Sequence, residues 1–179
     1  MKNQKGFTLI ELLTVMSIMI VVGIVITAIL ASILRGTNKT TTVSAVKQNG
    51  DYAISQMWKM IRNAASLDSG CSSQPTPTPM SSITITTVDG TQAVFDCNGT
   101  VGTPPQQTIA SNSASLLDTS AVSLVSNSCS FLCTQRSASD APFIQINFSL
   151  TSASTSQLVE QKVNAIPFQT SVIVRNQNR

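Results

Sequence analysis

The sequence has no histidine among its 179 residues, little charge and few aromatic rings. Histidine is the commonest general base, so its absence excludes Ser-His-Asp or Cys-His catalysis and an H-E-x-x-H zinc site. The chain also lacks the glycine-rich motifs G-x-G-x-x-G and G-x-x-x-x-G-K-[ST] that bind nucleotides. Its acidic residues beyond position 34 are scattered and form no evident pair. We therefore predict no catalytic residue, no metal site and no cofactor.

Charged residues make up only 11% of the chain and aromatic residues 4%, while Ser, Thr, Asn and Gln are abundant after Leu67. This composition is typical of a weakly charged, β-rich extracytoplasmic domain rather than a cytosolic enzyme. The net charge of +3 includes Lys2 and Lys5, so without them it is +3 − 2 = +1. A near-neutral chain gives no general reason to expect nucleic-acid binding. DNA is therefore a possible but unsupported partner.

One apolar run extends from Phe7 to Leu34. Over these 28 positions Glu11 is the only formally charged residue. About 20 apolar residues suffice to cross a bilayer as a helix, so residues 7–34 are predicted to span the membrane. Lys2 and Lys5 precede the run without an acid, which predicts a cytoplasmic N-terminus. A secretory signal would have its small-residue cleavage site after the run, whereas no A-x-A pattern follows Leu34.

The start of this run resembles the cleavage and methylation signature of type IV prepilins and type II secretion pseudopilins. Residues 6–13 are Gly-Phe-Thr-Leu-Ile-Glu-Leu-Leu, and the match to the signature is close to complete. The resemblance implies that residues 1–6 are a leader, that prepilin peptidase cuts between Gly6 and Phe7, and that Phe7 is then N-methylated. It also implies that Glu11, fifth in the mature chain, is required for filament assembly. Many family members have a proline in the first half of the helix, whereas this chain has none before Pro75.

There is also a physical reason for Glu11. Cleavage would leave a cationic amine on Phe7 inside the membrane, where an unpaired charge costs several kcal/mol. The Glu11 carboxylate of a neighbouring subunit could neutralise that amine and set the axial register between subunits. The alternative is a glutamate near the membrane edge whose side chain reaches toward the lipid head groups. With the flanking motif present, we favour the assembly role.

Four cysteines follow on the predicted extracytoplasmic side, and an even number there favours two disulfides. Three connectivities are possible, of which we favour Cys71–Cys97 and Cys129–Cys133. The first would join the end of the helix to a hairpin, and the second would close a local loop. Zinc binding is less favoured because Cys129-x-x-x-Cys133 has no matching second pair.

Residues 35–67 are predicted to continue the helix, to about Ser66, in amphipathic form. Gly36 and Thr40–Thr42 indicate a weak helical stretch, with a bend or hinge. Beyond them, apolar or small residues recur at steps of three and four and draw one stripe. The stripe contains Val43, Val46, Gly50, Ile54, Met57, Ile61 and Ala64.

Residues 68–179 are predicted to form a β-rich globular domain. The alternating prolines of residues 74–79 indicate an extended connector. Alternation over residues 82–88, then Asp89-Gly90 and residues 92–96, predicts a hairpin. Further strands are expected at 121–125, 130–132, 143–150 and 168–174, with an irregular loop at 98–115 and a polar turn at 152–157. One long helix packed on an antiparallel sheet is an α+β architecture.

These features favour a structural subunit, a minor pilin or pseudopilin, that serves pilus biogenesis, DNA uptake or protein secretion. The resemblance implies other pilin subunits, prepilin peptidase, an inner-membrane assembly platform and membrane lipid as partners. The subunit would cross the inner membrane once and then join an extracytoplasmic filament. The rival interpretation is an uncleaved, membrane-anchored binding module for a glycan or DNA.

Overall fold

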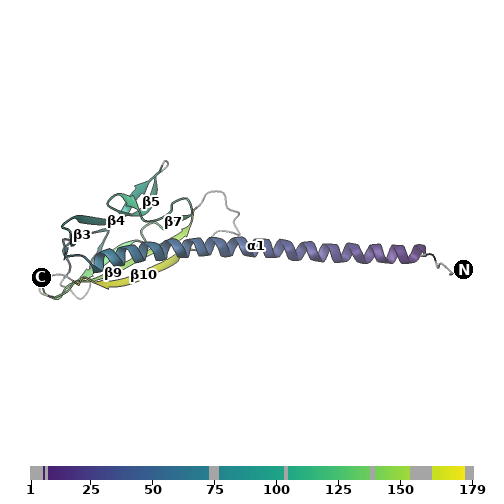
Figure 1. Ribbon diagram of the computed structural model, residues 1–179, viewed down its shortest axis with the longest axis horizontal. Helices are drawn as coiled ribbons and strands as arrows, with labels where there is room; N and C mark the ends of the chain where they lie inside the picture. Colours follow the sequence, from purple (N-terminus) through teal and green to yellow (C-terminus); the bar gives the residue numbers. More distant parts are fainter. Residues whose placement is uncertain are drawn as a thin grey trace. The chain divides into compact units, whose positions relative to one another are not determined.

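The computed structural model describes residues 6, 8–72, 77–102, 105–137, 140–153 and 163–175 (Figure 1). The chain divides into two compact units, Met1–Thr40 and Thr41–Arg179. Helix α1 (Leu9–Arg62) contributes residues to both units, and every described strand lies in the second. The fold is therefore α+β, as the sequence predicts.

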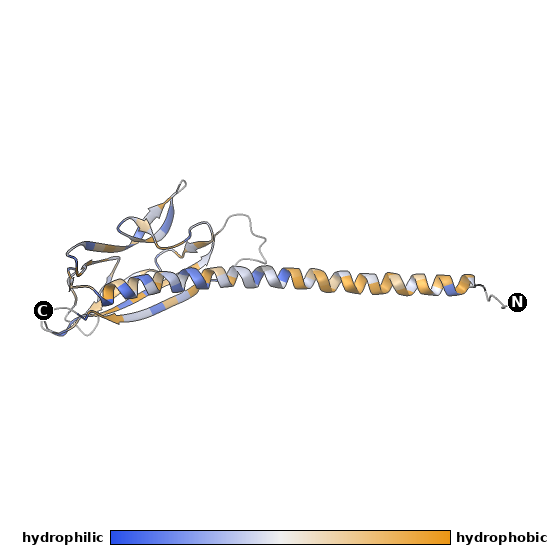
Figure 2. Ribbon diagram, in the orientation of Figure 1, coloured by the Kyte–Doolittle hydropathy of each residue, from blue (hydrophilic) through white to orange (hydrophobic). Residues whose placement is uncertain are grey.

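Within the first unit, α1 is mainly apolar from Leu9 to Leu34 and becomes polar from Arg35 (Figure 2). Several of its hydroxyls donate hydrogen bonds to backbone carbonyls three or four residues earlier, at 2.8–3.0 Å; the donors are Thr14, Ser17, Thr27, Thr37 and Thr40. Such bonds satisfy hydroxyls without water, which suits a helix in apolar surroundings. The helix also continues through Gly36 and Thr40–Thr42, where the sequence indicated weak helical propensity.

The predicted end of the helix near Ser66 is wrong by a few residues, because α1 ends at Arg62. The amide of Ala65 donates to the carbonyl of Thr86 at 2.8 Å. Ser66 then pairs with Thr86 in a sheet, so β1 (Ser66–Leu67) begins where the helix was expected to continue. Pairing with a distant strand thus overrides the local helical pattern.

The second unit contains two antiparallel sheets rather than the single sheet predicted. The first has the order β1, β3 (Ser82–Thr86), β4 (Gln92–Val101), β5 (Gln106–Ser111) and β6 (Ala114–Ser115). The second has the order β10 (Ile166–Ile173), β9 (Phe143–Ser152), β8 (Ser130–Thr134) and β2 (Pro79–Met80), and β7 (Val122–Leu124) also pairs with β9.

The predicted hairpin is confirmed, since β3 and β4 pair around Asp89-Gly90 and Gly90 has a φ of 81°. The predicted loop at 98–115 is wrong. β4 continues to Val101 through an irregularity between Asp96 and Gly99, and β5 and β6 follow it. Glycine here permits a close approach between strands, because an added Cβ at Gly99 would lie 2.6 Å from Cβ of Ala110. Gly99 therefore marks a bulge inside β4, whereas Gly102, with a φ of 81°, follows the last residue of that strand.

Two other predictions fall partly outside the described residues. Residues 74–76 of the proline-rich connector are not described. Pro79 lies in β2, the edge strand of its sheet, where a missing N–H is tolerated. Of the predicted polar turn, Ser152 belongs to β9 and residues 154–157 are not described.

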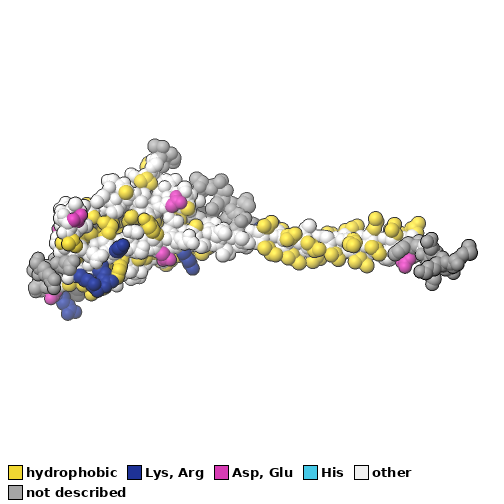
Figure 3. All heavy atoms as spheres, in the orientation of Figure 1, with side chains coloured by type: hydrophobic (Ala, Val, Ile, Leu, Met, Phe, Trp, Pro, Cys, Tyr) yellow, Lys and Arg dark blue, Asp and Glu magenta, His cyan; other side chains and the backbone are white. Residues whose placement is uncertain are grey.

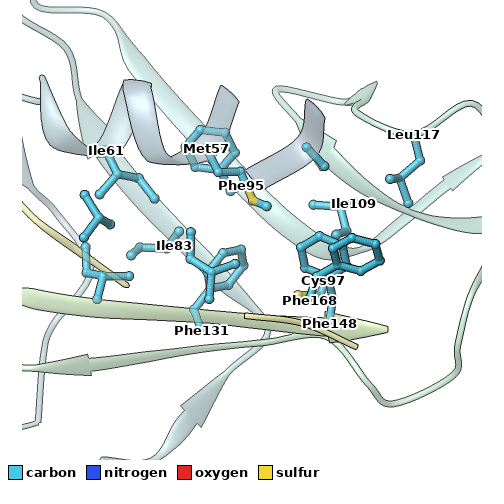
Figure 4. Packing of buried hydrophobic residues seen from close by; sticks show 14 of the residues in the cluster. Met57, Ile61, Ile83, Phe95, Cys97, Ile109, Leu117, Phe131, Phe148 and Phe168 are labelled. Carbon is cyan, nitrogen blue, oxygen red and sulfur yellow. The ribbon is translucent and has the colours of Figure 1, made fainter. Parts of the chain in front are cut away.

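One hydrophobic core joins the C-terminal part of α1 to both sheets (Figure 4). Most of the predicted helical stripe is buried, and Ala53 joins it; the buried members are Val46, Gly50, Ala53, Met57, Ile61 and Ala64. Phe148 of β9 stacks on Phe168 of β10 with ring centroids 5.3 Å apart. The alternation along residues 143–150 is confirmed, because Ile144, Ile146, Phe148 and Leu150 are all buried.

All four cysteines form disulfides, as predicted, but our favoured pairing is wrong. The bonds are Cys71–Cys133, with Cα atoms 4.9 Å apart, and Cys97–Cys129, with Cα atoms 5.6 Å apart. The cause is β8, which brings residues 129–133 beside the segment after β1 and beside β4. The amide of Ser72 donates to the carbonyl of Cys133 at 3.2 Å. Both disulfides therefore join the early part of the unit to β8 and the residues before it.

Candidate assembly site

The start of α1 contains a capping box formed by Thr8 and Glu11. The Thr8 amide and hydroxyl both donate to Oε2 of Glu11 at 3.1 Å. The Glu11 amide returns a bond to the Thr8 hydroxyl at 3.4 Å. Thr8 is thus the N-cap and Glu11 the third helical residue, in the spacing that satisfies unpaired amides at a helix start. This role of Thr8 was not predicted, although Thr-x-x-Glu before an apolar run is its signal in the sequence.

Glu11 places negative charge at the helix N-terminus, which the helix dipole favours. Its immediate neighbours Leu9, Ile10, Leu12 and Leu13 are all exposed and apolar. Within the described part of the chain, no Lys or Arg forms an ion pair with Glu11, and Oε1 accepts no hydrogen bond. Among the described residues, the carboxylate therefore has one oxygen held by Thr8 and one that accepts no hydrogen bond.

The helix beyond Glu11 exposes apolar side chains all round, with Leu, Ile, Val or Met at 18 exposed positions from Leu9 to Leu34. A helix that is apolar on every face is one that belongs in a bilayer or among other helices. By length and composition, α1 is long and apolar enough to cross a membrane.

Of the predicted processing residues, Gly6 is exposed and precedes the helix, and Phe7 lies outside the described residues. No heavy atom lies within 4 Å of where a Cβ on Gly6 would be. The four cysteines lie far along the chain, in the second unit, and are oxidised to disulfides, so they are not free metal ligands.

Elsewhere in the described residues, no group of three or more His, Cys, Asp or Glu side chains could hold a metal ion. A cavity of about 400 Å³ lies beside the Cys97–Cys129 bond, and the residues that line it provide no acid or base. Its polar side chains are Ser81, Asn98, Gln107, Asn127 and Ser130.

Residues 1–27 match the family model described as "Prokaryotic N-terminal methylation motif". The chain therefore carries the type IV prepilin signature, and the resemblance seen in the sequence is confirmed. Signature and apolar helix together support a membrane-anchored, pilus-associated protein of the type IV pilin-like or pseudopilin kind. No curated protein and no solved structure is significantly similar to the chain.

Proposed function

We propose that this chain is a structural subunit, a minor pilin or pseudopilin, of a type IV pilus-like filament. Prepilin peptidase would remove residues 1–6, Phe7 would be N-methylated, and α1 would pack among the helices of other subunits. The filament would serve pilus biogenesis, DNA uptake or protein secretion. The observation that carries the proposal is the methylation motif over residues 1–27, joined directly to a helix that is apolar all round.

The geometry at the start of α1 supports a specific role for Glu11. After cleavage, the Phe7 amine of an incoming subunit would be a cation in apolar surroundings, and it would need an anion to pair with. Thr8 holds Oε2 of Glu11 through two hydrogen bonds, which restricts the carboxylate while leaving Oε1 to accept the amine of the neighbour. The capping box would thus preorganise Glu11 for pairing between subunits, since fewer rotamers are lost on docking.

The pairing would also position the subunit along the filament axis. An apolar helix can slide along other apolar helices with little change in free energy, because hydrocarbon contacts are not directional. A single charge pair fixes one register, as a buried polar residue does in a coiled coil. The globular unit would then lie at one defined height in the filament.

The proposal is tested with Glu11→Gln, Glu11→Ala and Thr8→Ala variants, scored separately for processing and for entry into sheared filaments. Processing should continue in all three variants, because cleavage depends on the bond after Gly6. Filament entry should be lost in Glu11→Ala and Glu11→Gln, and reduced in Thr8→Ala, which keeps the charge but removes the hydroxyl. Normal entry of Glu11→Ala would refute the role of Glu11.

A substitution of Gly6 is the complementary test, since it should block cleavage and leave Met1–Gly6 on the chain. If the unsubstituted chain itself keeps Met1–Gly6 in the membrane fraction, the uncleaved binding module becomes the better account.

A further inference from the structure

An apolar groove with two cations lies between the end of α1 and the ends of β9 and β10. It has a volume of about 430 Å³ and is lined by Trp58, Arg62, Phe143, Ser171, Val172, Ile173 and Arg175. The amide of Arg175 donates to the carbonyl of Arg62 at 3.4 Å, which joins the end of β10 to the end of the helix. On the face of the unit in Figure 3, Lys and Arg side chains gather beside hydrophobic ones.

The groove exposes side chains that soluble surfaces usually bury. Phe143 is 42% exposed and Ile173, its partner across the two strands, is 54% exposed. The Arg62 guanidinium lies over the Trp58 ring, 4.5 Å from its centroid. Neither Arg62 nor Arg175 forms an ion pair with an acid of the described chain. The groove therefore suits a partner with an apolar side chain next to an anion.

The same chain presents that combination at the tip of the β3–β4 hairpin. Val88 is 73% exposed and is followed by Asp89, which is also exposed. Thr87 and Thr91 both donate side-chain hydrogen bonds to Oδ1 of Asp89, and the Thr87 hydroxyl is the main cause of a lowered pKa for this carboxyl. The tip thus holds an ionised carboxylate beside an exposed valine in a fixed turn.

Groove and hairpin tip lie on opposite flanks of the same turns of α1. Thr87 and Val88 at the tip line a hollow of about 360 Å³ together with four residues of α1, which are Gln56, Lys59, Met60 and Asn63. Each residue of an α-helix is rotated about 100° around the helix axis from the one before. On this basis, the four helix residues beside the tip point, on average, roughly 130° around the axis from Trp58 and Arg62. Met57 and Ile61 point into the core between the two flanks. Two complementary surfaces on opposite flanks make a heterologous contact, which can repeat from copy to copy in an open helical array.

We propose that the hairpin tip of one copy of this chain docks into the groove of a second copy, with Val88 on Trp58 and Ile173 and Asp89 between Arg62 and Arg175. This contact rests on the proposed filament function and requires that copies of this chain be neighbours in the filament, as in a pseudopilin filament or a cluster of minor subunits. It adds a lateral contact between globular units to the helix packing. Three features favour a second copy as the partner over an unrelated protein or a DNA strand. The charges of groove and tip are complementary, both expose apolar surface, and the contact can repeat from copy to copy.

The test uses the full chain with a benzophenone amino acid at position 88, irradiated in sheared filaments. A species of twice the chain mass should form, and trypsin should map the link to the peptide of residues 163–175 or to the segment around Trp58. The same amino acid at Ala114, an exposed residue of β6, is the control and should not give this link.

Charge exchange provides the second arm. Asp89→Arg and Arg175→Glu should each lower the yield of the linked species about two- to fivefold, the range of an exposed ion pair. Combining both in one chain should restore the yield, whereas Arg136→Glu, at another exposed cation, should leave it unchanged.

The copy-to-copy contact would be overturned if position 88 crosslinked to a different subunit, to another part of this chain or to nothing. It would also be overturned if the combined Asp89→Arg and Arg175→Glu chain failed to restore the yield. A peptide that begins at Phe7 in the same filaments would then leave the proposed function intact. Absence of the chain from filaments would overturn both.

Discussion

Gly50 allows a close approach between α1 and Phe168 of the second sheet, and replacing it with alanine tests how the core is packed. A Cβ at this position would overlap three atoms of the Phe168 ring, Cδ1, Cε1 and Cζ. The ring is buried and stacked on Phe148 at 5.3 Å, so it has little room to retreat. Gly50→Ala is therefore an insertion into a filled space rather than a conservative change.

Two opposing effects determine how much Gly50→Ala changes the free energy of unfolding. Replacing glycine by alanine inside a helix stabilises it by about 1 kcal/mol. Forcing one extra carbon into a packed core costs about 1–3 kcal/mol. Because Phe148 blocks the ring, we expect the upper half of that range and a net loss of about 1–2 kcal/mol in the free energy of unfolding. Helix propensity alone predicts the opposite sign.

The assay is chemical denaturation of the full chain in detergent, followed by fluorescence of Trp58, the only tryptophan. Gly36→Ala is the matched control, because its Cβ would meet no atom within 4 Å and stability should not fall. Phe168→Leu should cost less in the Gly50→Ala background than alone, with a coupling of about 1 kcal/mol. A Gly50→Ala chain as stable as the parent would refute the packing argument.

Three further changes test other contacts. Replacing both Cys97 and Cys129 by alanine opens a link across 32 residues and should cost about 3–4 kcal/mol by loop entropy, measured by denaturation. Asn49→Ala should lower the free energy of unfolding by about 1 kcal/mol, because the side-chain carbonyl of Asn49 accepts a 3.0 Å hydrogen bond from the amide of Asp118. Gln48→Ala, at the exposed neighbouring position, is the control and should change the stability little. A hydrogen bond from the Ser120 hydroxyl lowers the pKa of the Asp118 carboxyl in the folded chain. The ionised carboxylate therefore stabilises the fold above the ordinary pKa of 3.8, and this stabilisation is lost as pH falls below that value. Acid titration of stability should accordingly be shallower in Asp118→Asn than in the parent.

The disulfide pairing has a direct chemical test. Cleavage before aspartate separates Cys71, Cys97 and the pair Cys129 and Cys133 into three fragments. The structure predicts that all three stay linked without reductant, whereas the sequence-based pairing would leave the third fragment free. A further cut after Phe131 distinguishes the observed bonds from the remaining connectivity.

Sequence reasoning succeeded where the pattern is local and periodic. The apolar run, the helical stripe around Met57 and the alternation from Ile144 to Leu150 each follow from one repeating spacing, and the structure confirms them. The methylation motif was equally readable, because its residues are contiguous.

It failed where distant segments decide the outcome. The end of α1 is set by the pairing of Ser66 with Thr86, and the disulfides are set by the position of β8. Gly99 suggested a loop because a bulge inside a long strand uses the same residue type as a loop does. The groove at Trp58 joins a helix to two strands more than 80 residues away, so no spacing in the sequence could predict it.

The central claim is that the chain is cleaved after Gly6 and built into a filament through α1. Mass spectrometry of filaments sheared from cells tests it most directly, by measuring the N-terminal peptide. The account predicts a peptide that begins at N-methylated Phe7, and a low amount beside a dominant subunit would identify a minor pilin. A chain found only in the membrane fraction and still beginning at Met1 would contradict it.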